Sequence, residues 1–259
     1  MPEVRPYYSV RSLSAAYYDL ITQADTSLQG DVDTYAELAP PAGEILELGV
    51  GTGRVAFALA ELGFSVVGVD LAPAMLAQAE AKRANLAPHV GARVMLQLGD
   101  MTSLNIGRVF DAVICPFFAL SHLPAGAAWR NTFAGIASHL RPGGRAAVHM
   151  PLAELMQRPA PAPDAPVMRA PVDDQGRTLN LYVRERSFRP RINRFDQVLD
   201  YVLADAFGAV EQRSLERQTY YAADPTPFAL EAGLQIDGSP SLLGGVGEIH
   251  RYLKPASDA

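Results

Sequence analysis

The sequence predicts an α/β fold: a doubly wound, mostly parallel sheet, with an antiparallel β-meander inserted after the fifth strand. Three observations support this prediction. Between about residues 42 and 150, short apolar runs alternate with amphipathic helical patterns, as in parallel βαβ units with right-handed crossovers. After residue 150, three longer strand-like stretches come one after another, separated by short turns. The chain has 259 residues, 49% of them hydrophobic, which is enough for one large domain or one domain with an elaboration.

The parallel part contains five predicted strands, most of them rich in β-branched or other apolar residues. These strands are Glu44–Leu48, Ser65–Val69, Arg93–Leu98, Asp111–Cys115 and Arg145–Met150. The helices predicted between them are Thr52–Leu62, Pro73–Asn85 and Ala125–Leu140. Pro73 suits the first turn of its helix, where a missing N–H costs little. The run Arg141-Pro142-Gly143-Gly144 closes the last helix.

The remaining segments are predicted as a loop, a meander and short terminal elements. Pro159–Pro171 is rich in proline and alanine and is predicted as a loop. The meander stretches are Arg177–Phe188, Asn193–Asp205 and Ala209–Tyr221. They are followed by a helix at Asp224–Ala232 and by strands at Leu234–Asp237 and Ile249–Leu253, and helical pieces precede the core at Ala15–Ile21 and Asp31–Leu38. We expect four parts: a helical lid (1–40), an α/β core (41–150), a loop and β insertion (151–222), and a segment that completes the sheet (223–259).

Composition and charge narrow the classes of function. The net charge of -6 argues against a non-specific nucleic-acid binder, which needs a basic face. No apolar run approaches the roughly 20 residues that span a bilayer, and the first residues lack the apolar core of a signal peptide. A single cysteine, Cys115, excludes an intrachain disulfide and a Cys-rich metal site. We therefore expect a cytoplasmic protein, a monomer or homodimer, without nucleic-acid, membrane or metal partners.

A glycine-rich turn follows the first core strand, in the run Glu47-Leu48-Gly49-Val50-Gly51-Thr52-Gly53-Arg54. Glycines let the backbone approach a ligand, and the next helix presents free N–H groups. Arg54 stands where a dinucleotide fingerprint has its third glycine, and no Gly-Lys-Ser/Thr follows. With Glu47 before the turn, S-adenosylmethionine suits the pattern better than a dinucleotide. A packing role for the glycines is the alternative.

Two later carboxylates support a nucleotide-type site. Asp70 ends the second predicted strand and is placed to accept the hydroxyls of a ribose; Asp100 ends the third and is placed to meet an adenine amino group. Each has an alternative role as a strand-end cap or turn residue. Ligands of parallel α/β sheets bind at the carboxyl ends of the strands, where both residues are predicted to lie.

The chain resembles the class I S-adenosylmethionine-dependent methyltransferases, of the type that acts on small molecules. The matching stretches appear in the family's order: Ile45–Gly53, Val67–Leu76, Gly99–Met101, Phe110–Ile114 and Leu140–Gly144. The resemblance implies a Rossmann-like, seven-stranded sheet whose last strand is antiparallel to the others. It also implies a cofactor site near the following residues: Tyr18, Glu47, Gly49, Gly51, Gly53, Asp70, Leu71, Met75, Asp100, Met101 and Cys115.

Within that site, the resemblance assigns a part of the cofactor to several residues. Glu47 and Gly49 would lie at its methionine end, over which Tyr17 or Tyr18 would close. Asp70 would hold the ribose, with Leu71 and Met101 on either side of the adenine. Cys115 would begin the loop where cofactor and acceptor meet.

The acceptor site is less well defined by the sequence. The predicted substrate contacts are Tyr17, Phe117, His122, His149 and Arg184, and His122 is also the candidate general base. For His122 the alternative is a helix cap or packing against Trp129, and for His149 a satisfied buried histidine. Alternation places Tyr182, Arg184, Arg186 and Phe188 on one face, either as a basic pocket or as a solvated face paired with acids.

The predicted function is methyl transfer from S-adenosylmethionine to a nitrogen or oxygen of a small molecule, by in-line displacement. The sequence leaves two alternatives. One is a catalytically silent protein that binds the cofactor or a partner. The other is a nicotinamide-dependent oxidoreductase.

Overall fold

The computed structural model describes residues 3–9 and 11–256, so the outermost ends of the first and last predicted parts lie outside the described residues. The chain divides into two compact units, each built from separate stretches of sequence. Unit 1 contains Met1–Thr26 and Ala153–Ala222, and unit 2 contains Ser27–Leu152 and Ala223–Ala259. Residues 27–40, which we predicted as part of an N-terminal lid, therefore group with the core.

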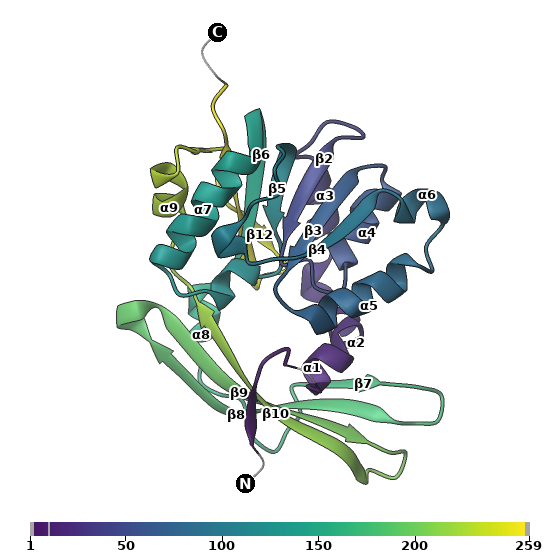
Figure 1. The fold of residues 1–259 in the computed structure, drawn as a ribbon. Helices are drawn as coiled ribbons and strands as arrows, with labels where there is room; N and C mark the ends of the chain where they lie inside the picture. The colour runs from purple at the N-terminus through teal and green to yellow at the C-terminus, as the bar shows by residue number, and fades with distance from the viewer. Residues whose placement is uncertain (1–2, 10, 257–259) are drawn as a thin grey trace. The chain divides into compact units, whose positions relative to one another are not determined.

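Unit 2 is an α/β unit around a mixed sheet, as Figure 1 shows. Its strands are β2 (Glu44–Leu48), β3 (Ser65–Asp70), β4 (Val94–Leu98), β5 (Phe110–Cys115), β6 (Leu140–Pro151), β11 (Gln235–Ile236), β12 (Ser241–Leu243) and β13 (Gly247–Leu253). The strand order is β11-β13-β6-β5-β2-β3-β4, with β12 paired to β13 outside this path. Strands β2 to β6 are parallel, and β13 runs antiparallel to β6. The order is that of a doubly wound sheet with a reversed strand near one edge.

Helices cover both faces of this sheet. The helices of unit 2 are α3 (Asp31–Ala36), α4 (Arg54–Glu61), α5 (Pro73–Arg83), α6 (Pro88–Gly91), α7 (Ala127–His139) and α9 (Thr226–Glu231), with 3-10 turns η2 (Met101–Ser103) and η3 (Ala119–His122). Apolar residues of α3 to α6 share one buried cluster with Ile45, Ala147 and Ile249 of the sheet. On the other face, α7 and α9 meet through Trp129 and Phe228, whose ring centroids are 5.4 Å apart.

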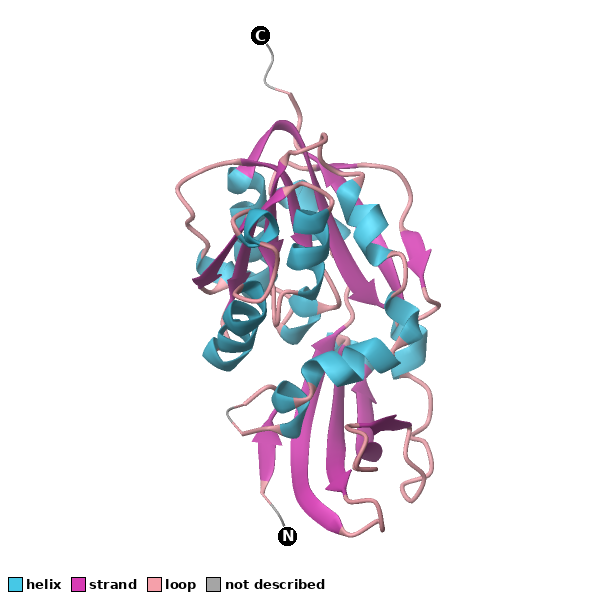
Figure 2. Ribbon diagram, turned by 90° about the vertical axis from the view of Figure 1, so that its right-hand side faces the viewer, coloured by secondary structure: helices cyan, strands magenta, loops and turns pink. Residues whose placement is uncertain are grey.

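Unit 1 is built on a five-stranded sheet. Its elements are β1 (Val4–Pro6), α1 (Leu13–Ala16), α2 (Tyr18–Ala24), α8 (Ala153–Met156), β7 (Met168–Pro171), β8 (Thr178–Arg189), β9 (Arg194–Ala204) and β10 (Val210–Tyr221), with η4 (Pro190–Ile192) between β8 and β9. Another 3-10 turn, η1 (Thr26–Leu28), lies where the chain passes into unit 2. Strands β7 to β10 are antiparallel in sequence order, and β1 adds in parallel beside β10. Figures 1 and 2 show the long strands of this sheet.

Several sequence predictions need correction. Met168–Pro171, predicted as loop, is the edge strand β7, and Pro171 stands at its end, where a missing N–H is tolerated. The predicted helix Ala15–Ile21 is divided at Tyr17 into α1 and α2. Strand β6 begins at Leu140 rather than Arg145, because Leu140 already pairs with Phe110 of β5.

The alternation predicted for the first meander strand is also wrong. A β-bulge lies between Val183 and Glu185 of β8. Tyr182 pairs with Asp200, whereas Arg186 pairs with Gln197, and these two partners lie on opposite faces of β9. One inserted residue moves the following side chains to the other face. Arg186 and Phe188 therefore do not share a face with Tyr182.

Candidate cofactor and acceptor site

The glycine turn joins β2 to α4 and is docked on the end of β3. The N–H groups of Gly49 and Val50 donate to the Val69 carbonyl, at 2.8 and 3.0 Å. Gly49, Gly51 and Gly53 all have positive φ angles, of 75°, 57° and 87°. Residues with a β-carbon rarely adopt this conformation, so each glycine is required by the backbone. The structure therefore places the turn at the carboxyl ends of the parallel strands, as predicted.

Asp70 connects the glycine turn to the turn after β3. Its Oδ2 accepts the Gly51 N–H at 2.7 Å, and its Oδ1 accepts the Ala72 N–H at 2.8 Å. Burial raises the pKa of Asp70, and the bonds from Ala72 and Gly51 lower it without cancelling the increase. The carboxylate is thus held in one orientation beside the turn. Leu71, the next residue, is 65% exposed.

Asp100 caps the 3-10 turn η2. Its Oδ1 accepts the N–H and the hydroxyl of Thr102, each at 2.8 Å. This is the capping role that the sequence offered as the alternative, and it fixes the carboxyl group at the end of β4. Met101 lies near the glycine turn, since a β-carbon on Gly49 would be 3.8 Å from its Cε. Met75, by contrast, is buried within α5, which favours a packing role for this side chain.

A cluster of buried polar side chains lies around the end of β2. Asp31 of α3 and Arg54 of α4 form a two-bonded ion pair, with N–O distances of 3.0 and 2.5 Å. Glu47 is 2% exposed, and its Oε2 has no hydrogen-bond partner among the described residues. Burial raises the pKa of Glu47 well above its ordinary value, although Arg54 acts in the opposite direction. The hydroxyl of buried Tyr35 is also without a described partner.

Sequence reasoning missed Asp31 and Tyr35. Both lie on a helix that was predicted, but nothing in the local sequence links them to the glycine turn. Their proximity to Glu47 and Arg54 depends on how α3 packs against α4. The available signal was the acidic residue at the start of the predicted helix, and such residues usually serve the helix dipole.

The segment after β5 brings several predicted residues together. Cys115 ends β5 and is buried, and burial raises the pKa of its thiol to about 12. Pro116 follows, then Phe117 and Phe118, and then η3, which ends at His122. A β-carbon on Gly49 would be 2.6 Å from Cβ of Ala119, so this segment lies against the glycine turn. The thiol is protonated at neutral pH and is not a nucleophile.

His149 lies in β6 and is fully buried. Its ring is 4.5 Å from the ring of Phe118, and neither ring nitrogen has a hydrogen-bond partner within the part of the chain that is described. Burial lowers the pKa of His149 to about 4. The ring is therefore neutral at physiological pH. Because neither ring nitrogen has a described hydrogen-bond partner, the alternative of a satisfied buried histidine was wrong.

The other predicted residues belong to unit 1. Tyr17 lies between α1 and α2, and Tyr18 begins α2, with its ring 5.5 Å from that of Tyr8. Arg184 donates to Asp200, a fully buried carboxylate that also accepts bonds from Arg213. Burial alone would raise the pKa of Asp200, but the bonds from Arg213 and Arg184 lower it. These ion pairs favour the structural role for Arg184.

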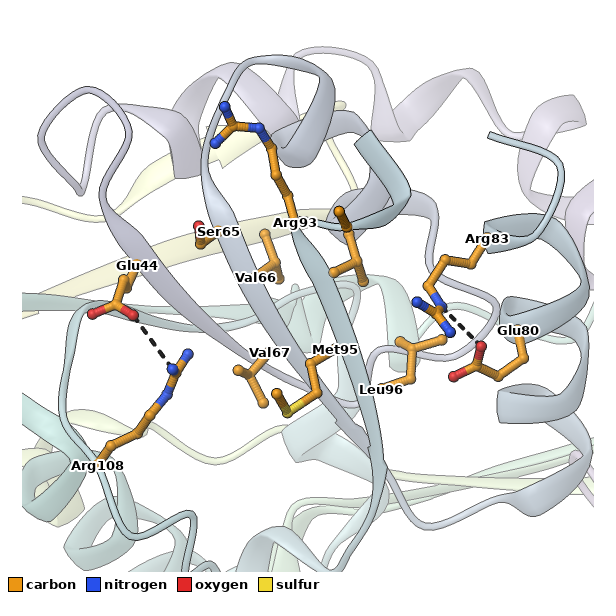
Figure 3. A pocket seen from close by; sticks show the side chains of 12 residues that line it. Glu44, Ser65, Val66, Val67, Glu80, Arg83, Arg93, Met95, Leu96 and Arg108 are labelled. Carbon is orange, nitrogen blue, oxygen red and sulfur yellow. Dashed lines mark hydrogen bonds and ion pairs between the residues drawn. The ribbon is translucent and has the colours of Figure 1, made fainter. Parts of the chain in front are cut away.

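The cavity shown in Figure 3 lies at the opposite ends of the strands. It has a volume of about 480 Å³ and is lined by residues near the starts of β2, β3 and β4, including Glu44, Ser65 and Arg93. Its arginines Arg83 and Arg108 pair with Glu80 and Glu44. The position excludes this cavity as the place for a ligand of the glycine turn.

Comparison with known proteins identifies the core. Residues 45–144 match the family model described as "Methyltransferase domain". This core is a methyltransferase domain. The predicted methyltransferase core is thereby confirmed, and the solved structures confirm its Rossmann-like fold.

Three relatives illustrate the similarity of this methyltransferase domain to known proteins. A dTDP-3-amino-3,6-dideoxy-alpha-D-glucopyranose N,N-dimethyltransferase from Streptomyces fradiae is 31% identical over 106 residues, which are 41% of this chain and 38% of that protein. The CcbJ methyltransferase from Streptomyces caelestis has the same fold, with a TM-score of 0.75, 22% identity, and coverage of 97% of this chain and 99% of that one. SAM-bound CalS10 from Micromonospora echinaspora, an amino pentose methyltransferase, has a TM-score of 0.67 and 25% identity, with coverage of 95% and 98%.

The extent of these matches differs between sequence and structure. In sequence, the chain spans between 38% and 51% of the length of the first three curated relatives that it matches. In structure, the similarity to CcbJ extends over nearly the whole chain. The methyltransferase core therefore has the recognisable sequence, and the regions outside it are similar in fold.

Neither a metal cluster nor a membrane-spanning helix occurs in the described part of the chain. Among residues 3–9 and 11–256, no group of three or more His, Cys, Asp and Glu side chains is arranged to hold a metal ion. No helix within the same residues is long and apolar enough to cross a bilayer.

Proposed function

We propose that this chain binds S-adenosylmethionine at the glycine turn and transfers its methyl group to a nitrogen or oxygen atom of a small-molecule acceptor. The observation that carries the proposal is the burial of the Glu47 carboxyl group. A carboxyl group that is 2% exposed and leaves one oxygen without a described partner is costly in a folded protein. It lies two residues before Gly49, where the resemblance expects the methionine end of the cofactor, and that end carries a positively charged amino group.

The residues at the glycine turn suit the other parts of the cofactor. Asp70 is oriented by two backbone N–H groups and still offers lone pairs to the hydroxyls of a ribose. The exposed Leu71 and the nearby Met101 supply apolar surface for an adenine ring. Asp100 is fixed at the end of β4, where it would receive the adenine amino group.

The chemistry of methyl transfer leaves the protein a limited task. Bound S-adenosylmethionine supplies an activated methyl group on a sulfonium, so the chain has mainly to align the acceptor and exclude water. Phe117, in the segment after β5, is suited to exclude water. His122, at the end of η3, would accept the proton of an acceptor that carries one.

The names of the relatives support a small, amine-bearing acceptor. One methylates an amino sugar nucleotide on nitrogen, and another is an amino pentose methyltransferase. For the present chain, a nitrogen acceptor is the first choice for testing, and an oxygen acceptor the second. A homodimer or monomer without nucleic-acid partners remains part of the proposal.

The first test is binding of S-adenosylhomocysteine, the product, measured by calorimetry. Replacing Asp70 by alanine (Asp70→Ala) removes the ribose acceptor and should weaken binding at least ten-fold, about 1.4 kcal/mol. Arg108→Ala is the matched control, because Arg108 lines the cavity at the opposite ends of the strands. Unchanged affinity of the Asp70 variant would remove the ribose assignment.

Two further experiments distinguish the alternatives from the proposed function. A nicotinamide-dependent oxidoreductase would be stabilised by NADH and not by S-adenosylhomocysteine in thermal-shift measurements. A catalytically silent protein would bind S-adenosylmethionine and methylate nothing in a panel of amines, phenols and alcohols. For an active enzyme, His122→Asn should lower turnover, because the variant side chain cannot accept the acceptor's proton. Full turnover at every pH would remove His122 as the base.

A further inference from the structure

Two consecutive phenylalanines after β5 have a conformation that side chains usually avoid. Phe117 has a φ angle of 43° and Phe118 one of 62°, both in the left-handed region. A β-carbon makes this conformation unfavourable, because it approaches the following carbonyl oxygen. A bulky pair in this conformation persists only where the surrounding structure holds it in place. The turn at these two residues, the Phe117–Phe118 turn, is therefore held by contacts from elsewhere in unit 2.

His149 of β6 is one of these contacts. Its ring lies 4.5 Å from the Phe118 ring, at an angle of 51°, and is fully buried. Both ring nitrogens are without a hydrogen-bond partner in the described chain, so the ring acts here through its packing surface. A pKa of about 4 keeps it neutral at physiological pH, which favours this apolar contact and disfavours a role as general base.

Gly247, the first residue of β13, lies against both rings of this contact. A β-carbon at this position would lie 2.6 Å from Cε1 of Phe118 and would also collide with Nε2 of His149. Its backbone pairs with Pro151 of β6. A glycine is thus needed for space, and residues from β6 and β13 together fix the Phe118 side chain.

The Phe117–Phe118 turn also sets the position of the next segment of the chain. It leads directly into η3, where the N–H of Leu120 donates to the thiol of Cys115. Ala119, the first residue of η3, lies against Gly49 of the glycine turn. A change in the Phe117–Phe118 turn would therefore alter Phe117, η3 and the cover of Cys115 together.

We propose that His149 is a positioning residue for methyl transfer: it packs against Phe118 and so holds Phe117 and η3 in the arrangement that receives the acceptor. The inference rests on the proposed function for its catalytic meaning. Its structural part is independent, because it concerns only the turn after β5. His149 itself contacts neither cofactor nor acceptor in this role.

The test compares His149→Ala with His149→Phe. The alanine variant removes the ring, and should lower kcat about ten-fold or more while S-adenosylhomocysteine affinity changes less than about three-fold. The phenylalanine variant restores a flat buried ring without nitrogen atoms, and should recover most of kcat. A merely structural role would lower the amount of folded protein without this split between kcat and cofactor affinity.

Cys115 supplies a second readout that needs no methyl acceptor. It is the single cysteine of the chain, and it is buried at the start of this segment with its pKa raised to about 12. A thiol reagent should therefore label the native protein slowly. Labelling should become about ten-fold faster or more in His149→Ala and return towards the native rate in His149→Phe, because opening of the turn governs access.

Gly247→Ala tests the same contact if the alanine variant of His149 does not fold. The added methyl group presses on Phe118 and His149, and should give the same loss of kcat and the same exposure of Cys115.

Two outcomes would overturn the inference. A phenylalanine variant as slow as the alanine variant would assign the role to the ring nitrogens, and native kcat with native protection of Cys115 in both alanine variants would remove the positioning role. Native protein that methylates no acceptor would count against the proposed function, while the labelling rates would still test the turn.

Discussion

In this protein, several residues that we assign to function bury a polar group, and this burial lowers the stability of the fold. Glu47, Tyr35 and His149 are all buried, and each has at least one polar atom without a described hydrogen-bond partner. Buried polar groups are nearly always bonded in native proteins. Asp31 and Arg54 affect the pKa values of all three groups, so the three lie within reach of one ion pair. Three such groups around one ion pair favour a binding site over ordinary core packing.

The stability of the free protein should respond to Glu47 with a definite sign. Glu47→Met removes a buried carboxyl of similar length and should raise the free energy of unfolding by roughly 1 kcal/mol or more at neutral pH. The pKa of Glu47 is raised in the folded state, so above the ordinary pKa of a glutamate the unfolded chain loses this proton first. The stabilising effect of the substitution should therefore be small below that pKa and grow as the pH rises.

The same substitution should weaken S-adenosylhomocysteine binding if Glu47 serves the methionine end. Denaturant unfolding at several pH values and calorimetry measure the two effects. Glu61→Met is the control, since Glu61 is an exposed residue at the end of α4 and should change neither quantity. A Glu47 variant that is both less stable and equally good at binding would contradict the assignment.

At the scale of elements, the glycine turn is determined by backbone conformation and by packing together. Gly53 has a positive φ angle and precedes the helix α4, and a β-carbon there would collide with the ring of Phe57. Gly63 also has a positive φ angle, of 99°, but a β-carbon there would meet no atom within 4 Å. A substitution at Gly63 therefore tests backbone strain alone, whereas one at Gly53 tests backbone strain together with steric overlap.

Alanine at these two positions should therefore have different costs. Gly63→Ala should lower the free energy of unfolding by about 1–2 kcal/mol, the cost of the left-handed conformation alone. Gly53→Ala should cost more, because Phe57 must also move, and it should weaken cofactor binding while Gly63→Ala leaves it unchanged. Thermal unfolding with and without S-adenosylhomocysteine measures both; equal losses at the two positions would contradict the steric argument.

At the scale of the whole molecule, both units combine segments from distant parts of the chain. The sheet of unit 1 joins β1, near the N-terminus, to β10, and that of unit 2 joins β6 to β13 across the intervening meander. Tyr252 of β13 is buried, and its ring lies 5.8 Å from that of Phe133 in α7. The last strand thus completes a core that the first 150 residues leave open.

This arrangement predicts that the C-terminal segment contributes strongly to stability. Tyr252→Ala should lower the free energy of unfolding by about 3–5 kcal/mol, as for other buried aromatic residues. Leu242→Ala, in β12 and 69% exposed, should change it by less than about 0.5 kcal/mol. Chemical denaturation followed by circular dichroism measures both; similar effects would mean that β13 is not part of the cooperative core.

The sequence by itself determined the order of the parallel core strands, the glycine turn and the resemblance to the family, because these depend on local periodicity and on contiguous motifs. Predicted and observed core strands start and end within a few residues of one another, except at the start of β6. Asp70 and Asp100 were placed correctly at strand ends for the same reason. Their roles toward the cofactor remain predictions.

Only the tertiary structure decided which side chains meet. The ion pair of Asp31 and Arg54, and the contact of Phe118 with His149 and Gly247, join residues with no shared local pattern. The bulge in β8 inserts one residue without a sequence signal and so reverses the faces that alternation predicts. Packing between distant segments fixes such contacts, and periodicity within a segment carries no information about them.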